Sequence, residues 1–272
     1  YAKKAAQKAH ANYAHSLAVK YYENALKHED SIEQVYEINL ALADIYTSTG
    51  EYRKALEQLH VCRKINAHAY LVYEKFGNVY EKMGDYKSSA KYYEKGMKIA
   101  KGSSAVYLFR AALAWLYTRV GQYVRARKEC EGMLRKKRLI GNQTLGDVYV
   151  ILGVVLLRLG RFNRAEGYFR KSLRIRKSTG DKKNIAACYV DLGLNYQGKF
   201  NIKMSEKFFN KALSLYQDIG YQEGILITLN NLGVMYASYD LPKAEAYCLE
   251  ALSKAKLIGA KRTIVLLYNN LV

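Results

Sequence analysis

The amino-acid sequence predicts an all-α protein, an α-solenoid of about six to seven helix-turn-helix repeats. Three observations predict this fold class. Apolar residues recur at intervals of three and four, the spacing that places them on one face of a helix. The same hairpin pattern returns along nearly the whole chain. Half of the 272 residues are hydrophobic, yet there is one proline and no Gly/Ser-rich run to mark a domain linker.

The clearest hairpin runs from Tyr149 to Leu173. Its first apolar stripe ends at Gly160, because glycine enters the left-handed conformation at a helix C-terminus without steric cost. Gly153 and Ala165 are small, so we expect them where the two helices approach most closely. The stripes consist of Tyr149, Leu152 and Leu156, then Phe162, Ala165, Phe169 and Leu173. One such hairpin cannot bury its stripes alone, so it needs neighbouring hairpins.

The order of small residue, Tyr, Gly-x-Tyr, Ala, aromatic and Ala resembles the tetratricopeptide repeat family. The first interval between the small residues is 34 residues, the length that this resemblance implies, and later intervals are about 40. The small residues of the six first helices are Ala43, Gly77, Ala114, Gly153, Gly193 and Gly233. The resemblance implies a right-handed superhelix whose first helices line a concave groove and whose second helices line the convex side.

The expected domain organisation is a single array over residues 1–272. A degenerate first repeat covers residues 1–28, full repeats start near residues 36, 70, 107, 146, 186 and 226, and a partial last repeat covers 261–272. Two hairpin turns should be irregular: Phe200 stands in a glycine position, and the segment from Tyr236 to Ala244 is one residue short. Because the last repeat stops before its second helix, we expect a fragment of a larger protein with flanking domains. The alanine-rich first helix and the long repeats resemble those of bacterial signalling proteins.

The motif search favours a protein that is not an enzyme. There is no Walker loop, no G-x-G-x-x-G, no His-Glu-x-x-His and no Cys-x-x-Cys, and the sequence indicates no cofactor and no metal site. A cluster of His10, His15 and Cys62 is the weak alternative. The cysteines are far apart and three of them fit core positions of the repeat, so we interpret them as reduced packing residues of a cytoplasmic protein. No apolar run is long enough to span a membrane.

The groove is the main candidate binding site. In the family that the chain resembles, first-helix residues three before and one after the small residue face the groove, so its middle should be apolar and its ends polar. The chosen groove residues are Asn78, Lys82, Trp115, Arg119, Val150, Val154, Arg158, Val190, Leu194, Asn230, Asn231 and Asn269. An apolar floor with a cationic rim suits a peptide or protein segment of acidic character.

The charge of the chain offers a second candidate surface. The formal net charge is +20, and basic residues concentrate on second helices and connections of the middle repeats. We place a convex basic band at Arg135, Lys136, Lys137, Arg138, Arg170, Lys171, Arg174 and Arg176.

The sequence therefore predicts a protein-protein interaction scaffold and leaves two alternatives. One is an intramolecular sensor arm of a signalling kinase or ATPase. The other is binding of nucleic acid or an anionic membrane, with nucleic acid the weaker because no recognition module accompanies the charge.

Overall fold

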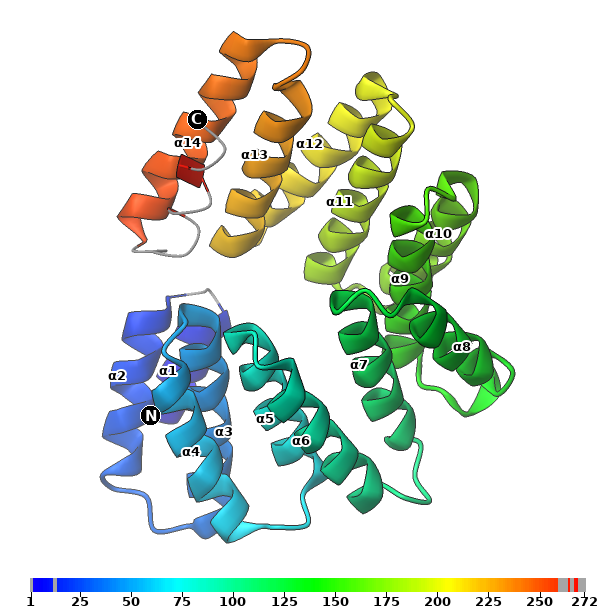
Figure 1. Cartoon of the computed structure of the whole chain (residues 1–272). Helices are drawn as coiled ribbons and strands as arrows, with labels where there is room; N and C mark the ends of the chain where they lie inside the picture. Colours follow the sequence, from blue (N-terminus) through cyan, green and yellow to red (C-terminus); the bar gives the residue numbers. More distant parts are fainter. Residues whose placement is uncertain (1, 12–13, 259–263, 265–266, 269–272) are drawn as a thin grey trace. The chain divides into compact units, whose positions relative to one another are not determined.

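The computed structural model is all-helical and confirms the predicted fold class. It describes residues 2–11, 14–258, 264 and 267–268, except for the side chains of residues 10 and 11. Within these ranges there are 14 α-helices, one 3-10 helix and no strand. Consecutive helices pack against each other as hairpins (Figure 1).

The chain divides into two compact units, Tyr1–Gly141 and Asn142–Val272, which we call unit 1 and unit 2. Unit 1 contains α1 (Ala2–Ala11), α2 (His15–Leu26), α3 (Ile32–Thr49), α4 (Tyr52–Ile65), α5 (Tyr70–Met83), α6 (Tyr86–Ile99), α7 (Val106–Arg119), α8 (Tyr123–Leu134) and η1 (Lys137–Leu139). Unit 2 contains α9 (Asn142–Arg158), α10 (Phe162–Thr179), α11 (Lys182–Gly198), α12 (Ile202–Asp218), α13 (Gln222–Tyr236) and α14 (Leu241–Leu257). A single array over the whole chain stays a prediction.

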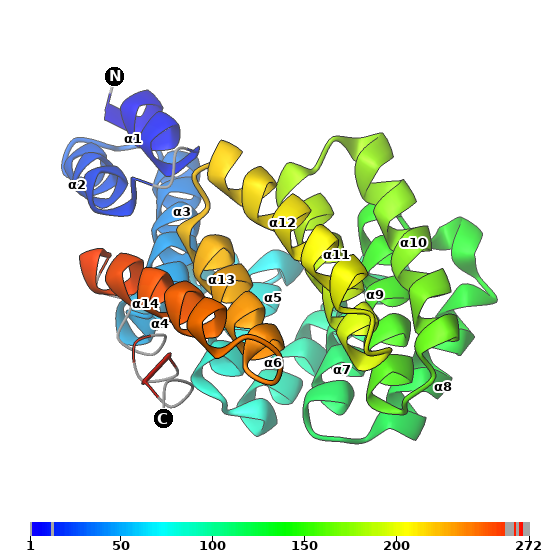
Figure 2. The ribbon, with the colours of Figure 1, turned by 90° about the horizontal axis from the view of Figure 1, so that it is seen from above.

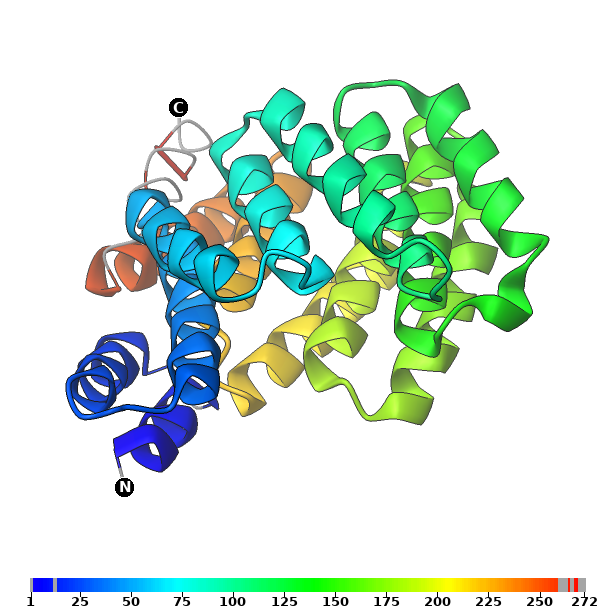
Figure 3. The same cartoon turned by 90° about the horizontal axis from the view of Figure 1, so that it is seen from below.

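Each odd-numbered helix pairs with the next helix, and within each unit each pair packs on the following pair. In unit 1, α5 pairs with α6 and also contacts α3 and α4, as Figure 3 shows from below. In unit 2, α11 pairs with α12 and contacts α9, α10 and α13, as Figure 2 shows from above. The odd-numbered helices are therefore the first helices of successive hairpins, as in a solenoid.

The glycines of the first helices lie at close approaches, as expected; at Gly77, Gly153 and Gly193 an aromatic ring fills the space, and at Gly233 the Cys248 sulfur does. A Cβ atom added at Gly153 or Gly193 would collide with the ring of Phe169 or Phe209 from the second helix of the same hairpin. Where the second helix carries serine, the hydroxyl adds a buried hydrogen bond: Ser205 Oγ donates to the Gly193 carbonyl at 2.9 Å. These contacts fix how closely the two helices of a hairpin pack.

The turn between α11 and α12 is regular, which corrects the expectation from Phe200. At Gly160, φ is +69° and the Arg161 N–H donates to the Leu156 carbonyl at 2.8 Å. At Phe200, φ is +57° and the next N–H, of Asn201, donates to the corresponding carbonyl at 3.0 Å. Phe200 thus adopts the left-handed conformation that glycine adopts elsewhere, at a steric cost.

The turn between α13 and α14 is irregular, as expected from its missing residue. Ala237 adopts the right-handed conformation. The Asp240 N–H donates to the Tyr236 carbonyl, four residues before it, at 2.8 Å, whereas the corresponding N–H groups of Arg161 and Asn201 donate to the carbonyl five residues before them. Pro242 lies in the first turn of α14, where its missing N–H breaks no helical hydrogen bond. The Asp240 side chain caps this helix by accepting from the Lys243 N–H at 3.1 Å.

An ionic cluster joins α10 to α11 within unit 2. The Glu166 carboxylate accepts hydrogen bonds from Lys199 Nζ at 2.7 Å, Arg170 Nε at 2.8 Å and the Tyr196 hydroxyl at 2.8 Å. Burial opposes the charge of Glu166, but these three donors outweigh it and lower the pKa of the carboxyl to about 2. Glu166 therefore stabilises the packing of one hairpin on the next in its ionised form.

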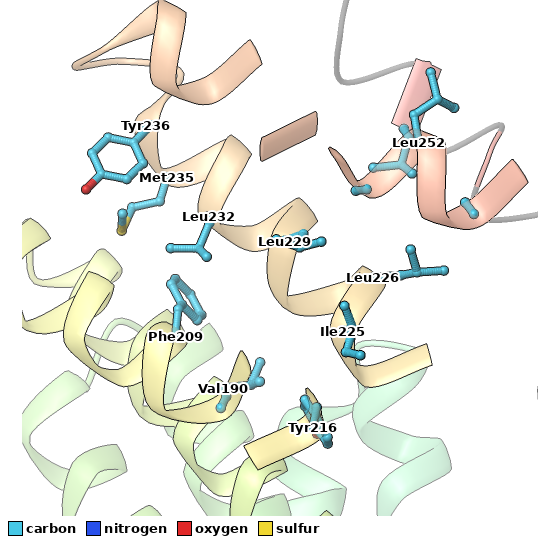
Figure 4. Close-up of a cluster of buried hydrophobic side chains, with 14 of the residues drawn as sticks. Val190, Phe209, Tyr216, Ile225, Leu226, Leu229, Leu232, Met235, Tyr236 and Leu252 are labelled. Carbon is cyan, nitrogen blue, oxygen red and sulfur yellow. The ribbon is translucent and has the colours of Figure 1, made fainter. Parts of the chain in front are cut away.

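One core cluster of unit 2 is formed mainly by apolar side chains from α11 to α14, and another includes side chains of α9 and α10. Figure 4 shows Phe209, Leu229 and Leu232 among the labelled members of the first cluster. One face of α11 departs from this apolar pattern. Asn195 is fully buried, and neither its amide nitrogen nor its amide oxygen has a hydrogen-bond partner within the described residues. One turn earlier, burial raises the pKa of the Asp191 carboxyl to about 7.

The four cysteines are core residues, as the sequence analysis predicts. Cys62, Cys130, Cys188 and Cys248 are free and buried. Burial raises the pKa of the Cys62 and Cys130 thiols to about 12. Such thiols are packing residues rather than nucleophiles.

Candidate functional site

The first helices of unit 1 carry a hydrogen-bonded polar network around Trp115. The indole Nε1–H of Trp115, on α7, donates to Glu81 Oε1, on α5, at 2.7 Å. Trp115 follows the small residue Ala114, and Glu81 lies one helical turn after Gly77, so the repeat spacing brings them together on neighbouring first helices. The bond fixes the orientation of a half-buried aromatic ring on this surface.

A second chain of hydrogen bonds holds Asn78. The Tyr93 hydroxyl donates to Asn78 Oδ1 at 2.6 Å, and Asn78 Nδ2 donates to Glu74 Oε1 at 2.6 Å. Burial raises the pKa of the Glu74 carboxyl and that of the Tyr93 hydroxyl. The predicted groove residue Asn78 is therefore orientated by its neighbours before any partner binds.

The rim residues predicted in unit 1 are exposed. Lys82 is exposed, and Arg119 is exposed with its Nη2 donating to the Tyr86 hydroxyl at 3.3 Å. Sequence reasoning did not select Glu81 or Tyr93. The sequence could have indicated Glu81 as a residue of this surface, because it lies one helical turn after the small residue Gly77 on α5. The ring of Tyr93 packs on Gly77 in the core.

The first helices of unit 2 present an apolar surface. Val154 on α9, Leu194 on α11 and Val234 on α13 each follow the small residue of their helix; the first two are half-buried and Val234 is 43% exposed. Val150 is half-buried at the preceding turn of α9. We call Val154, Leu194 and Val234 the apolar strip of unit 2.

Val190 requires a correction, because it is not part of an accessible surface. Its side chain is buried and belongs to the core cluster with Phe209 and Tyr216 (Figure 4). Of the remaining predicted groove residues, Arg158 is exposed and Asn230 and Asn231 are half-buried. Asn269 lies outside the described residues, as does nearly all of the partial last repeat predicted for 261–272.

The predicted basic band falls into two clusters in different units. Arg135, Lys136, Lys137 and Arg138 are exposed at the end of α8 and in η1 of unit 1. Arg170, Lys171 and Arg174 are exposed on α10 of unit 2. Arg176 is a second correction: it is only 3% exposed, forms an ion pair with Asp147 and covers Gly146. Its guanidinium joins α10 to α9 instead of contributing to the surface.

No arrangement typical of a metal centre or membrane span occurs in the described part of the chain. No three His, Cys, Asp or Glu side chains there are grouped so as to hold a metal ion, and no helix has the length and hydropathy needed to cross a bilayer. The imidazole of His10 is not among the described side chains, so the weak alternative with His15 and Cys62 stays a hypothesis.

Comparison with protein families gives two matches. A family model described as the tetratricopeptide repeat protein 21 C-terminal ARM domain matches residues 2–142, half of the chain. A model described as tetratricopeptide repeat matches residues 144–218. The two matches meet where the two compact units divide.

Curated relatives match a shorter stretch. Tetratricopeptide repeat protein 21A of Mus musculus is 32% identical over 105 residues, which is 39% of this chain and 8% of the relative. The Homo sapiens protein of the same name is 32% identical over 97 residues, 36% of this chain and 7% of the relative. The match spans less than a tenth of the length of either relative.

Solved structures share the fold at low sequence identity. A Rap protein complexed with competence and sporulation factor has a TM-score of 0.70 at 14% identity, over 97% of this chain and 77% of that one. The Cut9–Hcn1 structure has a TM-score of 0.68 at 15% identity, over 95% of this chain and 47% of that one. A signal transduction ATPase with a tetratricopeptide repeat sensor, from Pyrococcus horikoshii, has a TM-score of 0.60 at 19% identity, over 89% of this chain and 38% of that one.

Proposed function

The chain belongs to the tetratricopeptide repeat family, and on this premise we propose that it is a non-catalytic scaffold that binds a peptide segment of a partner protein along its first helices. The fold itself is consistent with a protein-protein interaction scaffold. The location of the binding surface and the chemistry of the partner are the parts that we propose.

The apolar strip of unit 2 is the observation that supports this proposal most strongly. Three successive first helices place a branched apolar side chain, Val154, Leu194 or Val234, at the same position after the small residue. Helices in contact have axes about 8–10 Å apart, so an extended or helical peptide can meet all three side chains in sequence. Apolar side chains repeated in this way on a surface are typical of a binding site.

The polar network of unit 1 offers a second surface for such a segment, within unit 1. Trp115 and Asn78 are held by Glu81, Glu74 and Tyr93, so little side-chain entropy would be lost when a partner binds. The ring of Trp115 can pack on an apolar side chain, and the exposed Arg119 can pair with a carboxylate. We therefore propose a partner segment that carries apolar and acidic residues, in agreement with the net charge of +20.

One alternative has a specific similarity in its favour. The Pyrococcus horikoshii neighbour is an ATPase whose repeats are described as a sensor. In a longer protein, the same surface would then bind an inducer or another domain of its own chain. We keep this intramolecular sensor arm as the second candidate. Nucleic-acid binding through the basic band has less support, because Arg176 is buried and no recognition module accompanies the charge.

The test is a selection from a random peptide display library on the 272-residue protein, followed by affinity measurements with fluorescent forms of the selected peptides. We expect Val234→Asp to weaken binding at least tenfold, because it places a charge in the apolar strip at an exposed position that tolerates it. Val124→Asp is the matched control, since Val124 is 84% exposed on the second helix α8 of unit 1.

Equal binding by wild type and a folded Val234→Asp protein would contradict the proposed surface. A selection that yields no peptide would favour the sensor arm, whose partner would be another part of a longer protein. Binding of labelled duplex DNA that is lost when Arg135 and Arg138 are changed to Glu would favour the basic band.

A further inference from the structure

Phe200 combines backbone strain with solvent exposure. It adopts φ +57° in the turn between α11 and α12, and its side chain is 81% exposed. Glycine occupies the left-handed position of the turn between α9 and α10 without this cost. The exposed phenyl ring contributes little to the core, so the fold gives no reason for a phenylalanine here. A strained residue with no role in packing points to a function of its side chain.

Other apolar side chains lie at the equivalent turns of unit 2. Leu159 is exposed in the turn before α10, Tyr239 is exposed in the turn before α14, and Leu241, the first residue of α14, is 70% exposed. Successive helices in unit 2 run in opposite directions, so α9, α11 and α13 run in the same direction. The three turns that follow them therefore lie at one edge of the unit (Figure 1). We call Leu159, Phe200, Tyr239 and Leu241 the turn edge.

The charges beside Leu159 and Phe200 are mainly positive. Arg161, Arg164 and Lys203 are exposed there. Lys199 and Lys243 are already paired with Glu166 and Glu206. The exposed acids at this edge are Asp240 and Glu245, both near α14. The end of the turn edge that contains Phe200 is therefore apolar and cationic.

We propose that the turn edge of unit 2 is a contact surface for an anionic lipid bilayer, with Phe200, Leu159 and Leu241 inserted among the headgroups. Apolar side chains at the tips of turns reach outward, and a fluid interface can accept them without a preformed pocket. Arginine and lysine beside them can pair with anionic headgroups. This surface lies at the turns and is distinct from the apolar strip, so the inference does not depend on the proposed peptide binding.

Two other occupants fit the observations less well. A second copy of the chain would bring together two proteins of formal charge +20, whose repulsion opposes association. A folded peptide partner would need a recess to bury its own apolar side chains, whereas Phe200 and Leu241 lie at turn tips. An anionic bilayer matches both the charge and the outward placement of the side chains.

The test is co-sedimentation of the 272-residue protein with vesicles of phosphatidylcholine alone and vesicles containing about 30% phosphatidylserine. We expect binding to the anionic vesicles only, and weaker binding as salt is added. Phe200→Gly and Leu241→Ser should each reduce the partition coefficient roughly tenfold, because each removes a large apolar side chain from the interface. Val124→Ser, at an exposed valine in unit 1, should leave it unchanged.

Phe200→Gly separates lipid contact from folding. Because glycine removes the strain at this position, the thermal midpoint should stay the same or rise while lipid binding falls. Absence of binding to anionic vesicles, or equal binding by wild type and both turn-edge variants, would overturn the proposal. A dimer of the wild-type protein that sedimentation velocity shows to be lost in Phe200→Gly would overturn it in favour of self-association.

Discussion

Replacing Asn195 with leucine should stabilise the protein, although it changes a fully buried residue. Asn195 lies on α11 with both polar atoms of its amide lacking a hydrogen-bond partner among the described residues. Leucine has the same number of side-chain heavy atoms and the same branch point, so the packing should change little. The corresponding position of the other hairpins is apolar and buried: Ile45, Val79, Leu116, Val155 and Met235.

The expected gain is about 2 kcal/mol. A buried amide without partners costs about 1–3 kcal/mol relative to its hydrated state, and leucine adds favourable apolar burial and a better helix propensity. Part of this gain is lost if the neighbouring side chains must move to fit the methyl groups. The reciprocal change, Leu116→Asn on α7 of unit 1, should destabilise by about 3 kcal/mol, because it buries an amide in an apolar site.

The assay is urea denaturation followed by circular dichroism, combined with hydrogen exchange of the segment 182–198. Hydrogen exchange is needed because stacked repeats can unfold in parts, and it reports the opening of α11 directly. We expect a higher urea midpoint and slower exchange in α11 for Asn195→Leu. A midpoint equal to or below that of the wild type, with exchange in α11 no slower, would refute the reasoning that the amide is unpaired.

Two further predictions concern the packing of unit 2. Glu166→Gln should cost about 2–3 kcal/mol at pH 7, because the pKa of Glu166 is about 2 instead of the usual 4.5. This stabilisation is present above about pH 4.5 and is lost as the pH falls towards 2, so urea midpoints that differ equally at pH 7 and at the acid limit would contradict it. Gly193→Ala should destabilise, since its Cβ would lie 2.5 Å from the buried ring of Phe209, whereas Gly167→Ala in the open middle of α10 should stabilise by up to about 1 kcal/mol. Thermal unfolding of both alanine variants checks this opposite sign, and a shared sign would contradict it.

The sequence was sufficient to predict the helix hairpins, because their signal is local. A helical stripe such as Tyr149, Leu152 and Leu156 depends on residues three and four apart, and Gly160 ends its helix through its own backbone freedom. Burial of Cys62, Cys130 and Cys248 followed from the same periodicity, whereas Cys188 matched no position of the repeat. The sequence predicted which residues of the first helices belong to the candidate groove from their positions in the repeat alone. The structure adds which of these side chains are exposed.

The tertiary structure decided what depends on contacts between elements distant in the sequence. Arg176 is two residues from the exposed Arg174 and on the same helix, yet it is buried because Gly146 of α9 leaves room for its guanidinium and Asp147 supplies an opposite charge. Likewise, Trp115 is orientated by Glu81 from another hairpin. No spacing within one helix reveals such a partner.

Phe200 shows the division between the two levels most directly. The sequence determines the repeat, its turn position and the presence of phenylalanine where glycine is expected. From the sequence we expected the turn to distort, because the sequence does not reveal whether the residue can accept the strain. The structure shows that the residue accepts it, because packing of α11 on α12 and the bond from Asn201 N–H to the Tyr196 carbonyl fix the turn. Helix periodicity depends on residues that are close in the sequence. The backbone strain and the exposure of Phe200 depend instead on how α11 and α12 pack, because this packing determines the conformation of the turn between them.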